Sequence, residues 1–212
     1  CSNYQKQNMY NKIKFLWLLI ASFVFDAGVN LTIAQSPSSE IKWVIEKNST
    51  LRVDGKSNVN SFTCNIKDYV ENDTISYNKG VTKLVNLSGH IQMGIIEFNC
   101  HSKQITNDLR KTLKAKDYPN LVIRFISLQS IPTFENKTET IKGWVEVELA
   151  GIKKKFELIY TFSKSARGNI QLNGGRSFSF SDFKLSPPRK LAGLVKVKDE
   201  FVVNFQLILR TV

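Results

Sequence analysis

Apolar and polar residues alternate along most of the chain from residue 41 to its end. A period of two is typical of β-strands that bury one face and expose the other. Turn residues interrupt the alternation at two places that predict hairpins, around Ala150-Gly151 and around Asp199-Glu200. Six further runs predict strands at 42–46, 51–55, 59–66, 90–100, 121–128 and 177–183. This part of the chain is therefore expected to be all-β.

The segment 101–116 follows a different period. Ile105, Leu109 and Leu113 recur every fourth residue among charged neighbours, which predicts one short amphipathic helix. Proline cannot continue a helix, so Tyr118-Pro119 predicts where it stops.

Many antiparallel strands must protect their edges, and two architectures do so. A sandwich covers its sheets face to face, whereas a barrel closes the sheet and turns alternate side chains inward. A barrel of about eight strands encloses either packed side chains or an elongated cavity for one ligand. We expect a single domain, because no repeat or linker divides residues 41–212.

The residues before this domain have the layout of a secretory signal peptide. A short basic lead follows Met9, and an apolar stretch at 15–25 ends at Asp26. The stretch is shorter than the roughly 20 residues that span a bilayer, so a signal peptide at 9–34 is favoured over a membrane helix. Small residues at Thr32 and Ala34 predict cleavage after Ala34.

This pattern divides the chain into three parts. Residues 1–8 are interpreted as an upstream extension, 9–34 as the signal peptide and 35–212 as the domain. The domain is expected to be exported, that is, periplasmic or secreted. Export favours oxidised thiols, so Cys64 and Cys100 are expected to form a disulfide that stabilises the fold by about 4 kcal/mol at most. Two buried free thiols are the alternative.

Composition and charge limit the classes of partner. The 212 residues are 42% hydrophobic and 23% charged, which excludes a disordered chain. Lys and Arg outnumber Asp and Glu by 30 to 18, giving a net charge of +12 that suits nucleic acid, anionic lipid or solvent. Removing residues 1–34 deletes three Lys and one Asp and leaves +10. An exported protein without a nucleic-acid motif is not expected to bind nucleic acid.

The side chains available for catalysis or metal binding are few. The chain has two histidines, His90 and His101. His101 follows Cys100, and neighbours on an extended strand point to opposite faces, which leaves a single ligand. We therefore expect no catalytic residue set, no metal and no cofactor.

Six short motifs, in order over about residues 41–211, make the chain resemble the YceI-like family of secreted bacterial proteins, which bind lipids or polyisoprenoids. They are Trp43-Val44-Ile45, Leu51-Arg-Val-Asp-Gly55, Asn58-Val-Asn-Ser-Phe62-Thr-Cys64, Asn107-Asp-Leu-Arg-Lys-Thr-Leu-Lys-Ala115 with Tyr118-Pro119 and Phe125, the hairpin at 143–151, and Ser181-Asp-Phe-Lys-Leu-Ser-Pro-Pro188 followed by Gly193. The two cysteines resemble a variant of exported members from the Bacteroidetes.

The resemblance implies a lipocalin-like antiparallel eight-stranded β-barrel with a helix beside it. It also implies an apolar tunnel for a long isoprenoid chain, without enzymatic activity. The expected partner is a long-chain isoprenoid or another lipid. Transient membrane contact and a homodimer are further expectations that the sequence leaves open.

The candidate tunnel wall follows from strand parity, with three flanking contacts. The wall comprises Phe125, Val145, Val147, Leu149, Phe156, Leu158, Phe178, Phe180, Val203 and Phe205, and the flanking residues are Phe62, Leu109 and Leu113. The alternative is an exported stress or interaction protein in which these residues simply fill the barrel. Lys153-Lys154-Lys155 and Arg189-Lys190 are candidates for a phosphate head group, and a solvated charge run is the competing interpretation.

Overall fold

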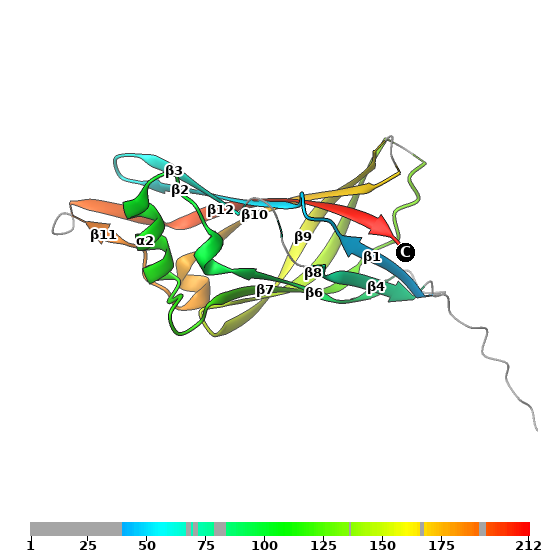
Figure 1. Cartoon of the computed structure of the whole chain (residues 1–212), viewed down its shortest axis with the longest axis horizontal. Helices are drawn as coiled ribbons and strands as arrows, with labels where there is room; N and C mark the ends of the chain where they lie inside the picture. Colours follow the sequence, from blue (N-terminus) through cyan, green and yellow to red (C-terminus); the bar gives the residue numbers. More distant parts are fainter. Residues whose placement is uncertain are drawn as a thin grey trace, which may run out of the picture. The chain divides into compact units, whose positions relative to one another are not determined.

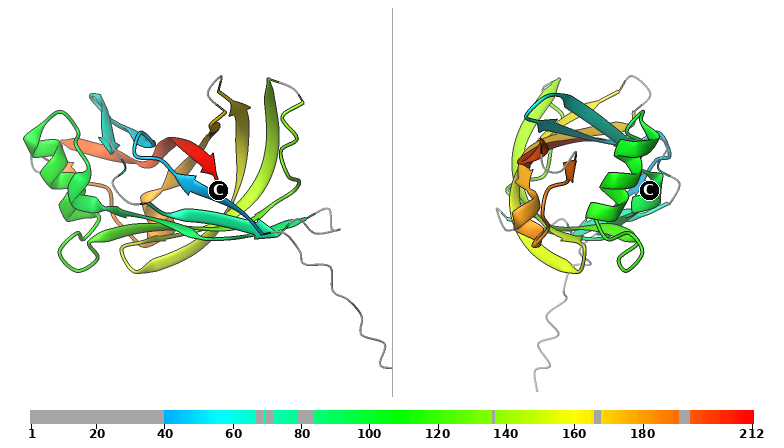
Figure 2. Two further views of the ribbon diagram at one scale, coloured as in Figure 1. Left: turned by 45° about the vertical axis from the view of Figure 1, so that its right-hand side comes forward. Right: turned by 90° about the vertical axis from the view of Figure 1, so that its left-hand side faces the viewer.

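Eight antiparallel strands form a closed ring. The computed structural model describes residues 40–66, 69, 72–78, 84–135, 137–165, 168–190 and 194–212. The ring order is β1 (Glu40–Ile45), β4 (Thr74–Asn78), β5 (Val85–Ser88), β7 (Asn120–Leu128), β8 (Thr138–Leu149), β9 (Ile152–Lys164), β10 (Ile170–Ser179) and β12 (Val195–Thr211). β12 pairs back onto β1 and closes the ring (Figures 1 and 2). The predicted eight-stranded barrel is confirmed.

Shorter strands extend the ring at its sides. The hairpin of β2 (Thr50–Ser57) and β3 (Ser61–Ile66) pairs with β12, and β11 (Arg189–Lys190) pairs with another part of β12. β6 (His90–Gly94) pairs with β7. In Figure 1 the β2–β3 hairpin, β11 and the helix lie toward the same end of the barrel.

The predicted helix is present but shorter. It is α2 (Lys103–Thr112), and it begins after Ser102, whose side chain accepts a hydrogen bond from the N–H of Ile105. It ends before Pro119 is reached, because Lys114 takes a left-handed conformation with φ 54°. Local capping therefore sets both ends of the helix.

The predicted hairpin around Ala150-Gly151 is confirmed. It joins β8 to β9, and both turn residues have positive φ, 50° and 78°, as in the tight turns that match strand twist. The positive φ of Gly151 favours glycine, and a Cβ there would also require the exposed ring of Tyr118, 2.6 Å away, to move.

The predicted hairpin around Asp199-Glu200 is wrong. β12 runs through both residues as one strand, and its register against β2 shifts between Val197 and Phe201. Asp199 accepts hydrogen bonds from the backbone N–H and the hydroxyl of Ser181, at 3.0 and 2.5 Å. The two polar residues therefore mark an interruption in the pairing of β12 with β2. In the sequence, such an interruption has the same polar pattern as a turn.

Two predicted strands end earlier than expected. β6 ends at Gly94 and is followed by the 3-10 turn η1 (Ile95–Glu97), and β10 ends at Ser179 before the 3-10 turn η2 (Phe180–Phe183). In η2 the carboxylate of Asp182 accepts the N–H of Ser179 at 2.9 Å and caps the turn. β4, β5 and β11 were not predicted, nor were the early part of β8 and most of β10.

A disulfide joins Cys64 on β3 to Cys100, which precedes α2. Both cysteines are buried, and their pairing decides between the two alternatives left by the sequence. Arg110 of α2 donates hydrogen bonds to the carbonyl oxygens of Ile96 and Phe98. These hydrogen bonds connect the helix to η1 and the residue after it, and the disulfide connects the segment between η1 and α2 to β3.

The predicted signal peptide and its cleavage site lie outside the described residues. Within the described ranges, no helix is long and apolar enough to cross a membrane.

Candidate binding cavity

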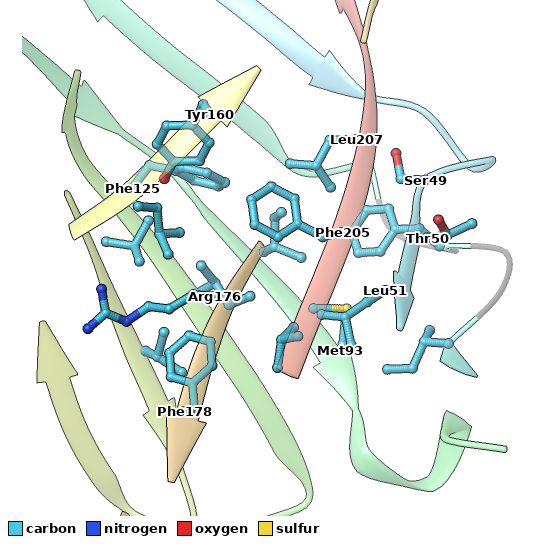
Figure 3. A pocket seen from close by; sticks show the side chains of 18 residues that line it. Ser49, Thr50, Leu51, Met93, Phe125, Tyr160, Arg176, Phe178, Phe205 and Leu207 are labelled. Carbon is cyan, nitrogen blue, oxygen red and sulfur yellow. The ribbon is translucent and has the colours of Figure 1, made fainter. Parts of the chain in front are cut away.

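The barrel interior contains two adjoining apolar chambers. The tyrosine chamber, shown in Figure 3, has a volume of about 50 Å³. Its lining comprises Ser49, Thr50, Leu51, Ile66, Tyr69, Ile91, Met93, Ile123, Phe125, Val145, Val147, Leu158, Tyr160, Arg176, Phe178, Val203, Phe205 and Leu207. These residues come from the ring strands β7, β8, β9, β10 and β12, from β2, β3 and β6, and from the segments that contain Ser49 and Tyr69.

The second chamber, the helix chamber, has a volume of about 70 Å³ and lies against α2 and η2. Its lining comprises Leu51, Val53, Phe98, Leu109, Leu113, Leu121, Ile123, Val147, Leu149, Phe178, Phe180, Phe183, Phe201 and Val203. Five residues line both chambers: Leu51, Ile123, Val147, Phe178 and Val203. The chambers are therefore neighbours along one barrel interior.

Strand alternation explains why the interior is apolar. On β8, Val145 and Val147 point inward, while Glu146 and Glu148 point outward. Arg124 on the adjacent β7 pairs with Glu148 at 2.8 Å on the outer face. The same strand thus presents charge to solvent and methyl groups to the cavity.

Aromatic rings form one wall of the helix chamber. The ring centroids of Phe178 and Phe201 lie 6.0 Å apart, and those of Phe180 and Phe201 lie 4.8 Å apart. Phe183, only 2% exposed, packs against Phe178 at 6.4 Å. These contacts join η2 to β10 and β12 and hold the chamber in shape.

The tyrosine chamber differs because polar groups reach it. Tyr160 is 1% exposed, and its hydroxyl has no hydrogen-bond partner among the described residues. Burial raises the pKa of Tyr160, so it stays protonated as a donor. Arg176 donates to the carbonyl oxygen of Glu157 at 2.7 Å and lies over the ring of Phe156 at 5.2 Å. Figure 3 shows Tyr160 and Arg176 on different strands around the same space.

Most of the predicted lipid-binding residues line the chambers. The eleven that do so are Leu109, Leu113, Phe125, Val145, Val147, Leu149, Leu158, Phe178, Phe180, Val203 and Phe205. Phe156 is buried and lines neither chamber, and its ring lies 4.8 Å from that of Phe178. Phe62 covers Gly55 on the neighbouring strand and lines neither chamber. Contact of any of these residues with a lipid stays a prediction.

Several lining residues were missed. Tyr160 shares the parity of Leu158 on β9, and Phe201 and Leu207 share that of Val203 on β12, so alternation alone could have identified them. Phe183 carried no such signal, because it lies in η2, where strand parity does not apply.

The basic residues proposed for a head group have acidic neighbours. Lys153 lies 3.7 Å from Glu148, and Lys154 pairs with Asp182. These contacts neutralise part of the charge and favour the interpretation of a solvated, paired surface. The side chain of Lys190 lies outside the described part of the chain.

Nothing in the described ranges gathers three His, Cys, Asp or Glu side chains as a metal site would require. His101 Nε2 lies 3.2 Å from the side-chain nitrogen of Asn65.

A scan of protein-family models finds no match to the sequence, and neither does a search of curated proteins. Solved structures do match. BcnA of Burkholderia cenocepacia is 13% identical with a TM-score of 0.57, covering 76% of this chain and 95% of BcnA. A polyisoprenoid-binding domain from Saccharophagus degradans, implicated in plant cell wall breakdown, is 11% identical with a TM-score of 0.59, covering 80% and 97%.

A Campylobacter jejuni YceI protein is also similar, at 20% identity and a TM-score of 0.47, covering 59% of this chain and 72% of that protein. The two likenesses above show a shared fold. The eight-stranded barrel that the resemblance implied is thus a fold that this chain shares with BcnA and with the polyisoprenoid-binding domain.

Proposed function

We propose that this protein is a non-enzymatic carrier that sequesters or transports a long-chain lipid, such as a polyisoprenoid, inside its barrel. The observation that carries the proposal is the pair of adjoining apolar chambers, which share five lining residues. The structural likeness to a polyisoprenoid-binding domain supports it. Export to the periplasm or medium is part of the proposal, and the disulfide suits that oxidising environment.

The apolar lining of the chambers suits a hydrocarbon chain. Each buried CH2 group stabilises a complex by about 0.8 kcal/mol, so an apolar tunnel binds a long chain without specific polar contacts. The chamber volumes, about 50 and 70 Å³, are small beside the roughly 300–1,000 Å³ of pockets for drug-sized ligands.

The same small volumes favour a second candidate function. In an exported stress or interaction protein, the barrel would be filled by its own side chains and would need no ligand. The two functions differ in whether lipid accompanies the protein.

Native mass spectrometry of the full chain, purified from the medium or periplasm of a bacterial host, separates them. Under the carrier proposal, a solvent-extractable lipid is bound near one to one. The matched variants are Val203→Phe, which fills the position common to both chambers, and Val202→Phe on the outer face of the same strand, where the side chain is 39% exposed. Val203→Phe should lose most of the bound lipid and Val202→Phe should keep it.

Circular dichroism and urea unfolding confirm that both variants fold. A wild-type protein that carries no lipid and takes up no hydrophobic probe contradicts the carrier. Equal lipid content in both folded variants would show that the lipid binds outside the two chambers.

A further inference from the structure

Tyr160 is a buried hydrogen-bond donor that has no acceptor within the part of the chain that the structure describes. It belongs to β9, where alternation turns it inward with Leu158, and its side chain lines the tyrosine chamber. Its ring lies next to Gly143, where a Cβ would approach Tyr160 Cε2 to 2.7 Å. On the other side its ring centroid lies 6.1 Å from that of Phe205. The ring is thus held between β8 and β12.

No side chain within the described ranges supplies the missing acceptor, and Thr50 in the chamber lining is no exception. Ser49 Oγ accepts the N–H of Ile208 at 3.0 Å, and the hydroxyl of Tyr69 donates to Asp73. Arg176 is itself only a donor. Most buried polar groups in proteins have a partner, and an unsatisfied one costs about 1–3 kcal/mol. A phenylalanine would avoid this cost, so the hydroxyl needs an explanation.

Resting on the proposed carrier function, we propose that the Tyr160 hydroxyl donates a hydrogen bond to an uncharged carbonyl oxygen of the bound lipid. A ketone, ester or amide supplies this acceptor, whereas a bare hydrocarbon does not. The tyrosine chamber then holds the carbonyl end and the helix chamber holds the chain.

An uncharged acceptor fits the surroundings better than an anion. Most of the lining is aliphatic or aromatic, and an isolated carboxylate or phosphate buried there would be costly to desolvate. The nearest candidate for a counter-charge, Arg176, lies at the exposed side of the chamber and already contacts Glu157 and the ring of Phe156.

The test uses two probes that differ in one group: a methyl ketone of seventeen carbons and the linear alkane of the same length. Their affinities are measured on the full chain by displacement of fluorescent phenylnaphthylamine, after co-purified lipid has been removed. Tyr160→Phe should weaken ketone binding about tenfold and leave alkane binding unchanged, because one hydrogen bond to a buried donor is lost. Tyr77→Phe is the matched control, since Tyr77 is a buried tyrosine that lines neither chamber.

Three outcomes overturn the proposal. The first is that Tyr160→Phe weakens ketone and alkane binding equally, and the second is that it leaves the ketone affinity unchanged. Either result contradicts a hydrogen bond from Tyr160 to the ketone. The third is that Arg176→Gln selectively weakens ketone binding while Tyr160→Phe binds the ketone normally. That result would place the carbonyl oxygen beside Arg176 instead of Tyr160. If neither probe displaces the dye from the wild type, the carrier function itself fails, which is a different result from loss of selectivity.

Discussion

The two chambers of the barrel differ in their lining residues and in the elements that bound them. The helix chamber has an entirely apolar lining, and it is bounded by α2, η2 and a group of phenylalanine rings. The tyrosine chamber is bounded mainly by strands and receives polar groups from Ser49, Tyr160 and Arg176. A single barrel interior thus contains an entirely apolar region beside a region that carries a buried hydroxyl group. Under the proposals above, the first region binds the hydrocarbon chain and the second recognises one oxygen atom of the lipid.

The two regions are also held in place differently. Around the tyrosine chamber, β8 and β9 pair continuously from Thr138 to Leu149. Around the helix chamber, irregular segments replace long strands, and the Cys64–Cys100 disulfide and Arg110 hold them. We expect the helix chamber to respond more strongly to loss of individual contacts.

The largest expected effect comes from opening the helix chamber with Phe183→Ala. Removal of this buried ring should lower the free energy of unfolding by about 3–5 kcal/mol, measured by urea denaturation. It should also shift the preferred lipid toward longer chains, because the added space lies at the proposed chain end. Leu158→Ala, in the tyrosine chamber, should leave the preferred chain length unchanged. The same shift in both variants would contradict the proposed arrangement, in which the tyrosine chamber binds the carbonyl end and the helix chamber binds the chain.

A somewhat smaller effect is expected from the Cys64→Ser, Cys100→Ser double variant. Loss of the cross-link should lower the free energy of unfolding by about 2–4 kcal/mol. Hydrogen exchange should rise first in α2 and η1, and only later in β8 and β9, because the bond anchors the helix end. A reductant should destabilise the wild type and leave the double variant unchanged. Uniform acceleration of exchange would show that both regions unfold together.

The smallest effect concerns pH at the edge of the helix chamber. The hydrogen bond from Lys154 lowers the pKa of Asp182, and the N–H of Ser179 and the charge of Arg176 act in the same direction. A carboxyl with a lowered folded-state pKa stabilises the fold above its unfolded pKa of about 4, and this contribution disappears as the pH falls through the folded value. The stability difference between the wild type and Asp182→Asn should therefore shrink between pH 6 and pH 3 in urea unfolding. A difference that stays constant over this range contradicts the assignment.

Alternation along the sequence, together with the helical period at 101–116, predicted strands and eleven of the lining residues, because inward residues such as Val147 and Val203 are determined by parity alone. The choice of a barrel over a sandwich came from the resemblance to the YceI-like family. Parity failed where pairing is interrupted. The polar residues Asp199 and Glu200 suggested a turn, whereas the strand continues through a register shift and Asp199 bonds to Ser181. Phe183 was missed because a capped 3-10 turn, not a strand, carries it into the chamber.

The unpaired hydroxyl of Tyr160 could not be predicted at all. Whether a buried donor finds an acceptor depends on the residues of β8, β10 and β12 that surround it, and these are distant in the sequence. The disulfide was predicted as a pair, but its place beside α2 required the topology that brings β3 to the segment before the helix.

Closure of the ring also sets the order in which the molecule can be completed. The last ladder joins Trp43 to Thr211 and Ile45 to Leu209, and the N–H of Val212 donates to the carbonyl oxygen of Lys42. Contacts this distant in sequence form slowly, since a very long loop must close first. The ribosome must therefore synthesise residue 211 before β1, which also pairs with β4, can complete its pairing with β12. Until then the sheet of the nascent chain has open edges.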